Sequence, residues 1–187
     1  ALSNSVYLAS LAAPDRRIEL KSDVPGLVRF RFSEDGNYLA ARTGQYFLRV
    51  WNVETGQIVA SIDQLVIDPT FAAGGRVLVV AMRKGNDHEI VFYDLAHADR
   101  PPRRVPGKDY SRSLAVSPDG GLVASPTFGG LVRLFDPAKG EWIESLHGHL
   151  NAVFSVAFSK DGRRLISTSG GRESIKLWDV GTRQELL

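Results

Sequence analysis

Residues 175–180 read Ile-Lys-Leu-Trp-Asp-Val, which is a short apolar run, then an aromatic residue, then an acidic one. The same order occurs three more times, once with an amide in the acidic place: Leu48-Arg49-Val50-Trp51-Asn52-Val53, Ile90-Val91-Phe92-Tyr93-Asp94-Leu95 and Val132-Arg133-Leu134-Phe135-Asp136-Pro137. The four aromatic residues Trp51, Tyr93, Phe135 and Trp178 are spaced by 42, 42 and 43 residues. A fixed period of this length is the signature of a repeat architecture.

A turn sequence precedes each copy of this pattern. Three of the turns have the form Ser-x-Asp-Gly, at 33–36, 117–120 and 159–162, and Ala72-Ala73-Gly74-Gly75 holds the same place in the remaining period. Asp-Gly readily adopts the positive φ that tight hairpin turns require. Each period is therefore predicted to contain at least one β-hairpin.

Four short strands are predicted in each period. In the first full period they cover 28–32, 38–42, 47–52 and 57–62. In the last period they cover 153–158, 164–169 and 174–179, and a fourth strand starts at Gln184. Runs of about five residues between Gly, Asp and Pro turns, without a 3.6-residue period, indicate antiparallel all-β structure.

Several of these runs are apolar on successive residues instead of alternating. Examples are Leu-Val-Val-Ala at 78–81 and Ile-Val-Phe-Tyr at 90–93. A strand with this composition has both faces covered, as when small sheets stack around an axis.

The repeat resembles that of the WD-repeat (WD40) proteins. The matching residues are Gly148-His149, Phe-Ser-x-Asp-Gly at 158–162 and Ile-Lys-Leu-Trp-Asp at 175–179. The resemblance implies an all-β, WD40-type β-propeller of about 4.5 four-stranded antiparallel blades, within a ring of about seven. Residues 1–22 are expected to form the last two strands of an incomplete blade. Three full blades are expected over 23–64, 65–106 and 107–147. Residues 148–187 are expected to form a last blade that is truncated in its fourth strand.

The two ends of the chain are expected to leave the ring open. Residues 5–11 align with 174–180, and 17–20 read as a fourth strand, so the first blade lacks its first two strands. Repeat arrays need covered ends. We therefore expect an excerpt of a larger multidomain protein, with the missing blades supplied by the rest of the chain; the alternatives are another copy of the chain or an open arc.

The resemblance also implies a hydrogen-bonded network in each blade. In the family, a His, a Ser or Thr ten residues before the aromatic, an Asp six before it and the Trp form this network. In the last repeat these places hold His149, Thr168, Arg172 and Trp178. The earlier repeats have Ala41 and Gln45, Arg83 and Asp87, and Ser125 and Gly129. No repeat is complete, so apolar stacking is expected to stabilise the blades instead.

Composition excludes several classes of protein. The chain has no Cys, which rules out a disulfide scaffold, Cys-ligated zinc and thiol catalysis and fits a reducing compartment. No apolar run reaches the roughly 18 residues of a membrane span. No signal peptide is visible. The net charge of +2 is too small to indicate nucleic-acid binding. We expect a cytoplasmic protein that binds neither membrane nor nucleic acid.

No catalytic, metal or cofactor site is predicted. His147 and His149 form a His-x-His pair, but Gly148-His149 is interpreted as the turn that begins a repeat. No Gly-x-Ser-x-Gly occurs. The alternative, a ligand-binding or enzymatic propeller using its central channel, would need His, Asp or Glu on the first strand of each blade. The first strands at 28–32, 113–117 and 154–158 offer Arg29 and Arg31, but no acid and no His.

A partner-binding face is predicted where the loops that lead into each first strand meet those between second and third strands. Arg and aromatic residues, the types that anchor binding patches, occur in these loops. The candidates are Arg42, Tyr46, Arg83, Lys84, Tyr110, Arg112, Phe128 and Arg172. The fold class and this face together indicate a non-catalytic protein-interaction scaffold or sensor module. Its partner is expected to be a protein or peptide, with some preference for an acidic one.

Overall fold

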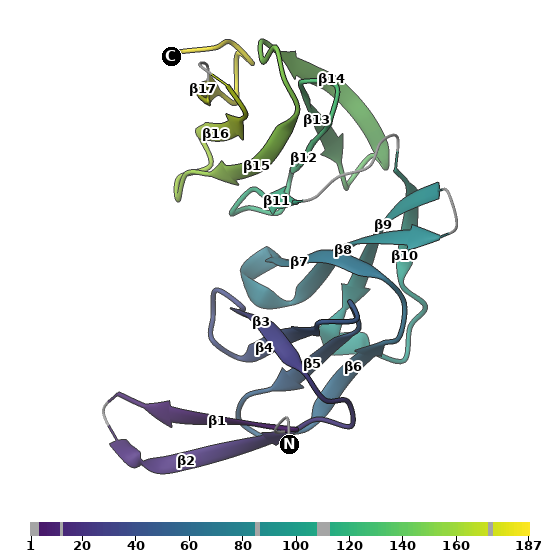
Figure 1. The fold of residues 1–187 in the computed structure, drawn as a ribbon, viewed down its shortest axis with the longest axis vertical. Coiled ribbons are helices and arrows are strands. Elements are labelled where there is room, and N and C mark those ends of the chain that lie inside the picture. Colours follow the sequence, from purple (N-terminus) through teal and green to yellow (C-terminus); the bar gives the residue numbers. More distant parts are fainter. Residues whose placement is uncertain (1–3, 12, 85–86, 108–112, 172–173) are drawn as a thin grey trace.

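The chain folds into a curved stack of small antiparallel sheets (Figure 1). The computed structural model describes residues 4–11, 13–84, 87–107, 113–171 and 174–187. The strands are β1 (Ser5–Ser10), β2 (Ala13–Lys21), β3 (Leu27–Phe32), β4 (Tyr38–Thr43), β5 (Leu48–Asn52), β6 (Ile58–Ile62), β7 (Val66–Ala72), β8 (Val77–Lys84), β9 (Asp87–Asp94), β10 (Arg103–Pro106), β11 (Ala115–Val116), β12 (Val123–Pro126), β13 (Leu131–Asp136), β14 (Glu141–His147), β15 (Val153–Phe158), β16 (Arg164–Ser169) and β17 (Ile175–Asp179). Two single 3₁₀ turns, η1 (Ala73–Gly75) and η2 (Leu95–His97), join strands.

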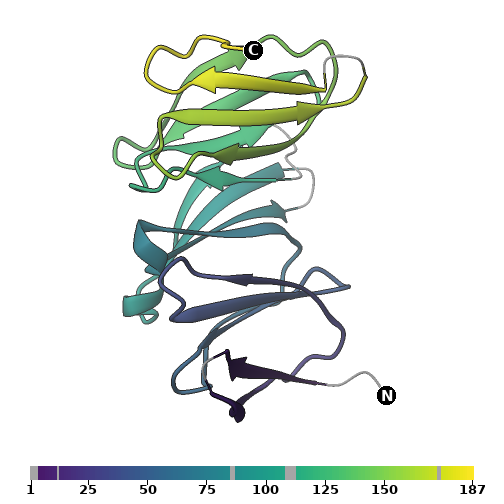
Figure 2. The ribbon, with the colours of Figure 1, turned by 90° about the vertical axis from the view of Figure 1, so that its left-hand side faces the viewer.

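Within each sheet, strands that are consecutive in the sequence pair with each other. The sheets are β1-β2, β3-β4-β5-β6, β7-β8-β9-β10, β11-β12-β13-β14 and β15-β16-β17. All of these pairings are antiparallel, so each sheet is built from local hairpins. Figure 2, which looks onto one side of the curved stack, shows the sheets lying one on the next. The prediction of about four and a half antiparallel blades in a propeller arrangement is confirmed.

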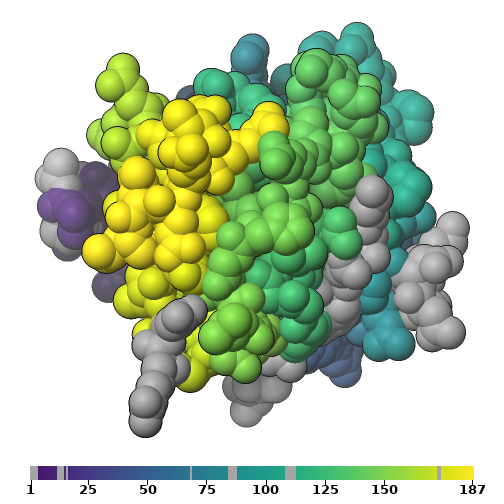
Figure 3. All heavy atoms as spheres, turned by 90° about the horizontal axis from the view of Figure 1, so that it is seen from above, coloured from purple at the N-terminus to yellow at the C-terminus, as the bar shows by residue number. Residues whose placement is uncertain are grey.

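The last sheet begins a fourth strand without completing it within the described residues. Trp178 forms an isolated bridge with Glu185, and the Leu177 N–H donates to the Leu187 carbonyl at 2.9 Å. The C-terminal residues, yellow in Figure 3, lie against the green residues of the preceding part of the chain. Arg183 reaches Glu144 of β14 with an Nη1–Oε2 distance of 2.9 Å.

Four apolar clusters lie between successive sheets and form the core. Val80 packs in the cluster shared by β3–β6 and β7–β10, whereas its neighbour Val79 packs in the cluster shared by β7–β10 and β11–β14. Both side chains are fully buried. The successive apolar residues of β8 are thus explained, because both faces of the β7–β10 sheet are covered by neighbouring sheets.

Glycines in the turns between first and second strands bring neighbouring sheets into contact. Gly75, Gly120 and Gly162 have φ of 96°, 76° and 71°. A Cβ at Gly75 would lie 2.4 Å from Asp35 Oδ1 of the preceding turn, and one at Gly162 would lie 3.5 Å from Pro118 Cδ. Only glycine has both the conformational freedom and the small size needed at Gly75. Gly36 differs, because nothing lies within 4 Å of its Cβ position.

No membrane-spanning helix occurs in the part of the chain that the structure describes.

Candidate partner-binding surface

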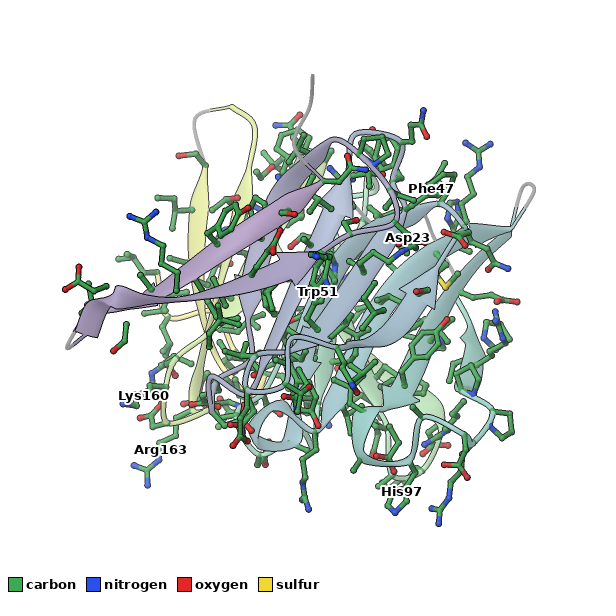
Figure 4. All side chains as sticks on the ribbon, turned by 90° about the horizontal axis from the view of Figure 1, so that it is seen from below. Asp23, Phe47, Trp51, His97, Lys160 and Arg163 are labelled. Carbon is green, nitrogen blue, oxygen red and sulfur yellow. The ribbon has the colours of Figure 1, made fainter. Side chains whose placement is uncertain are left out.

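The strand ends form two opposite faces of the arc. We call the loop face the end that holds the loops into first strands and those between second and third strands; the opposite end is the turn face. Hydrogen bonds align the loop face from sheet to sheet. The Val66 N–H donates to the Tyr46 carbonyl and the Val153 N–H to the Thr127 carbonyl, both at 2.9 Å. In Figure 4, Asp23 lies toward the loop face, and Lys160, Arg163 and His97 lie at the turn face.

Arg42 and Tyr46 form the best-defined pair on the loop face. The Arg42 guanidinium carbon lies 4.4 Å from the centroid of the Tyr46 ring, within the range of a cation–π contact. Tyr46 has a φ of 70°, which is unusual for a residue with a side chain. Tyr46 as a whole stays 42% exposed. The backbone thus presents an aromatic ring and a guanidinium group together at the surface.

The other predicted residues of this face are spread over several sheets. Phe128 lies in the β12–β13 loop with 47% of its surface exposed. Arg83 is exposed near the end of β8, and its backbone N–H donates to the Leu65 carbonyl at 3.2 Å. Lys84 ends β8, and its side chain lies outside the described atoms. Tyr110, Arg112 and Arg172 lie outside the described residues. The structure therefore brings Arg42 and Tyr46 into contact and leaves Phe128 on another sheet.

A buried arginine missed in the sequence fixes two loops of this face. Arg49 on β5 has a side chain only 2% exposed. Its Nε and Nη2 donate to Asp23 at 2.6 and 2.9 Å, and its Nη1 lies 2.7 Å from Asp63 Oδ1. The Arg49 guanidinium holds the pKa of Asp23 below its usual value, despite the opposing effect of slight burial. Asp23 precedes β3 and Asp63 follows β6, so one side chain fastens both loops.

A signal for this arginine was present in the repeat. A basic residue stands two places before the aromatic residue in three of the four repeats, as Arg49, Arg133 and Lys176. Lys176 is also buried, and its Nζ contacts Glu185. A charge in an otherwise apolar strand needs a partner when it is buried.

The repeated aromatic residues occupy core positions. Trp51, Phe135 and Trp178 are 0%, 0% and 2% exposed. The Trp51 indole N–H donates to the Lys21 carbonyl of the preceding sheet at 2.8 Å. Tyr93 is partly buried, which raises the pKa of its phenol, and its O–H contacts Met82 Sδ at 3.9 Å.

The last sheet contains part of the network that the resemblance implies. The Trp178 indole N–H donates to Ser167 Oγ at 2.8 Å, and His149 Nε2 lies 2.7 Å from the same oxygen. The assignment of Thr168 to this network was wrong. Counting back from the aromatic fails because the hairpins differ in length. The residue opposite the aromatic lies twelve places before Trp51 and Phe135, thirteen before Trp178 and fifteen before Tyr93.

The hydroxyl position lies two residues after the one that pairs with the aromatic residue. By this register it holds Ala41, Val80, Ser125 and Ser167 in the four repeats. The hydroxyl position is thus held by Val80 and not by Arg83, and by Ser167 and not by Thr168. In the other two repeats it is held by Ala41 and Ser125, as the sequence predicted. Two of the four sheets carry an apolar residue at a position where a complete network needs a hydroxyl.

Comparison with known proteins agrees with a fold built from repeated antiparallel sheets. Residues 140–179, which span β14 to β17, match the family described as WD domain, G-beta repeat. The chain therefore carries a WD repeat and is similar to WD-repeat proteins. It is 29% identical over 159 residues to WD repeat-containing protein SL1-17 of Schistosoma mansoni, a match that covers 83% of this chain and 51% of that protein.

Two further relatives of this WD-repeat chain have names that refer to a cellular role. Nuclear distribution protein nudF of Emericella nidulans is 25% identical over 187 residues, covering 86% of the chain and 40% of that protein. Mitogen-activated protein kinase-binding protein 1 of Homo sapiens is 36% identical over 76 residues, covering 40% of the chain and 5% of that protein. The chain spans about half or less of the length of the curated relatives it matches.

Proposed function

We propose that this WD-repeat chain is a non-catalytic interaction platform whose loop face binds a protein or peptide partner. The proposal rests on one observation: sheet-to-sheet hydrogen bonds align loops far apart in sequence, and these loops present the Arg42–Tyr46 pair, Phe128 and Arg83 to solvent. Arg and aromatic side chains are enriched where interfaces gain most of their affinity. WD-repeat proteins in general act as protein-interaction scaffolds, and one relative is named for binding a kinase.

The second candidate is a ligand-binding or enzymatic propeller that uses its inner strands. The sequence reading of three first strands overlooked the fourth, β7, which carries Asp68. One acid alone is a weak basis for proposing catalysis, because active sites bring several reactive groups together in one pocket. The described residues contain no group of three or more His, Cys, Asp or Glu that could hold a metal ion. We therefore favour the platform.

We also infer that further blades cover the two open sheet faces, from the rest of a longer chain or from another copy. On β3, Val28, Phe30 and Phe32 are 61%, 48% and 53% exposed, although strands of this kind bury apolar side chains elsewhere in the molecule. At the other end, Phe154 and Ile175 are 43% and 55% exposed. Exposed apolar faces of this kind are typical of interaction surfaces.

Site-specific photo-crosslinking in cells tests the loop-face proposal. A photoreactive phenylalanine at Tyr46 or Phe128 should form a covalent adduct with a partner protein. The same group at His97 or Lys160, exposed on the turn face, is the matched control and should not form that adduct. Reversing the charge of Arg83 together with Arg112 should lower the adduct yield. Adducts formed only from the turn face would overturn the proposal.

A further inference from the structure

Three arginines gather on one face of the β3–β6 sheet, at its inner edge. Arg29 and Arg31 are two residues apart on β3, so their side chains leave the same face. Arg42 on β4 is the direct cross-strand partner of Arg29, which places it on that face as well. The next inner strand, β7, lies beside this edge in both Figure 1 and Figure 2.

Arg31 and Arg42 both donate hydrogen bonds to neutral groups of β7. Arg31 Nη1 donates to Thr70 Oγ1 at 3.2 Å, and Arg42 Nη1 donates to the Ile67 carbonyl at the long distance of 3.4 Å. Arg42 Nε is enclosed and has no hydrogen-bond partner among the described residues. Buried polar groups are nearly always paired, so an enclosed N–H of a charged group calls for an explanation.

This arrangement is unfavourable for a protein that binds nothing here. The Tyr46 ring is held against Arg42 by a backbone with positive φ, which is strained for a residue other than glycine. Costs of this kind concentrate at binding sites, where a ligand compensates for them.

We propose that Arg29, Arg31 and Arg42 bind a doubly or more highly charged oxyanion, of phosphate or clustered-carboxylate chemistry, beside β7. Guanidinium groups offer paired N–H donors that match phosphate and carboxylate oxygens, and the described residues supply no acceptor for Arg42 Nε. The proposal extends the proposed function, because Arg42 belongs to the loop face, and it names the chemistry that the site recognises.

Thermal unfolding and calorimetric titration of the purified protein test this site with small anions. Pyrophosphate represents phosphate chemistry, citrate represents clustered carboxylates, and sodium chloride at equal ionic strength is the reference. A ligand that binds only the folded state stabilises it by RT ln(1 + [L]/Kd), so the melting temperature should rise with the logarithm of the anion concentration once that concentration exceeds Kd. We expect such a rise with pyrophosphate, citrate or both, and the more effective anion identifies the natural source of the charge.

Arginine variants separate a specific site from general charge screening. Arg31→Gln combined with Arg42→Gln should weaken anion binding about tenfold or more, as expected when charge-assisted hydrogen bonds are lost. Lys160→Gln combined with Arg163→Gln, which removes an equal charge from the turn face, should bind like the parent. If the arginine double variant does not fold, Arg29→Gln replaces it, with Arg163→Gln as its control. No stabilisation beyond chloride, or an equal loss in the turn-face control, would overturn the proposal.

These small-anion measurements do not depend on a protein partner. Failure of the anion site would leave the crosslinking test of the loop face unaffected. Failure of crosslinking at Tyr46 and Phe128 would likewise leave an oxyanion site at the inner edge intact.

Discussion

Trp51 and Trp178 occupy the same repeat position, yet their indoles are satisfied in different ways. Trp178 donates to Ser167 within its own sheet, and His149 contacts the same hydroxyl. Trp51 donates to the backbone carbonyl of Lys21, which belongs to the preceding sheet. The β3–β6 sheet has Ala41 at the hydroxyl position and fastens its loops through Arg49 instead.

This difference shows which part of the repeat the fold requires. Both sheets keep a large buried aromatic residue, whereas each finds its polar partners from different elements. A buried N–H needs some acceptor, but backbone and side-chain oxygens serve equally well. The aromatic residue is therefore the common structural requirement, and the hydrogen-bonded network is one of several ways to accommodate it.

The largest expected effect comes from deleting either indole. Trp51→Ala and Trp178→Ala should each lower the free energy of unfolding by about 3–5 kcal/mol, because each leaves a cavity in a packed core. Urea denaturation measures this loss. Trp142→Ala, at a half-buried tryptophan of β14, is the control and should cost less. Unchanged midpoints in both core variants would show that the repeat register is wrong.

Arg49 is expected to produce the next largest effect, and only in the β3–β6 sheet. Asp23→Asn combined with Asp63→Asn leaves a buried guanidinium without its anions and should cost about 2–3 kcal/mol. The loss falls short of that for a fully buried pair because the carboxylates are 59% and 64% exposed. Arg49→Met removes the buried charge and should cost less than the double variant. An equal or larger loss in Arg49→Met would mean that packing of the arginine stem is the main contribution.

Ser167 gives a smaller effect that is specific to the last sheet. Ser167→Ala leaves the Trp178 N–H and the His149 ring nitrogen without their shared partner and should cost about 1–3 kcal/mol. Thr168→Val is the matched control, because Thr168 lies next to Ser167 and makes neither contact. Ser125→Ala should also cost little, because Phe135 has no N–H to satisfy. A larger loss in Thr168→Val would restore the spacing-based assignment.

The sequence predicted the sheets well because their signals are local and repeated. Asp-Gly turns, apolar runs and the four aromatic residues placed the hairpins, and 153–158 and 164–169 match β15 and β16. Hairpin length between second and third strands was harder to predict. One extra residue before Trp178 moved the hydroxyl position from Thr168 to Ser167.

Contacts between distant segments could not be predicted from the pattern. Nothing in the sequence around Arg49 shows that Asp23 and Asp63 meet it, because the pairing depends on where two loops lie after folding. The juxtaposition of Arg29 with Arg42 follows from a bulge in β3 that shifts the register after Leu27. The loop face was predicted from topology, but the contact between Arg42 and Tyr46 depends on the positive φ of Tyr46.

The smallest expected effect concerns a feature that the two sheets share, the Ser-x-Asp-Gly turn. In the last sheet, hydrogen bonds from the Ser159 hydroxyl and the Arg163 N–H lower the pKa of Asp161 below 3.8. In the β3–β6 sheet, partial burial raises the pKa of Asp35, but hydrogen bonds from Ser33 and Asn37 outweigh it and the net pKa is also lowered.

A carboxyl with a lowered pKa in the folded state stabilises the protein above its unfolded pKa, and that contribution is lost as the pH falls. The parent protein should therefore lose stability as the pH falls below about 4. Asp35→Asn and Asp161→Asn should each be less stable than the parent at pH 7 and show a shallower decline on acidification. Urea midpoints between pH 7 and 3 measure both slopes. Because the two turns have the same geometry, the two variants should show similar slopes of stability against pH. A variant whose slope equals that of the parent protein would mean that its turn does not require the ionised carboxylate.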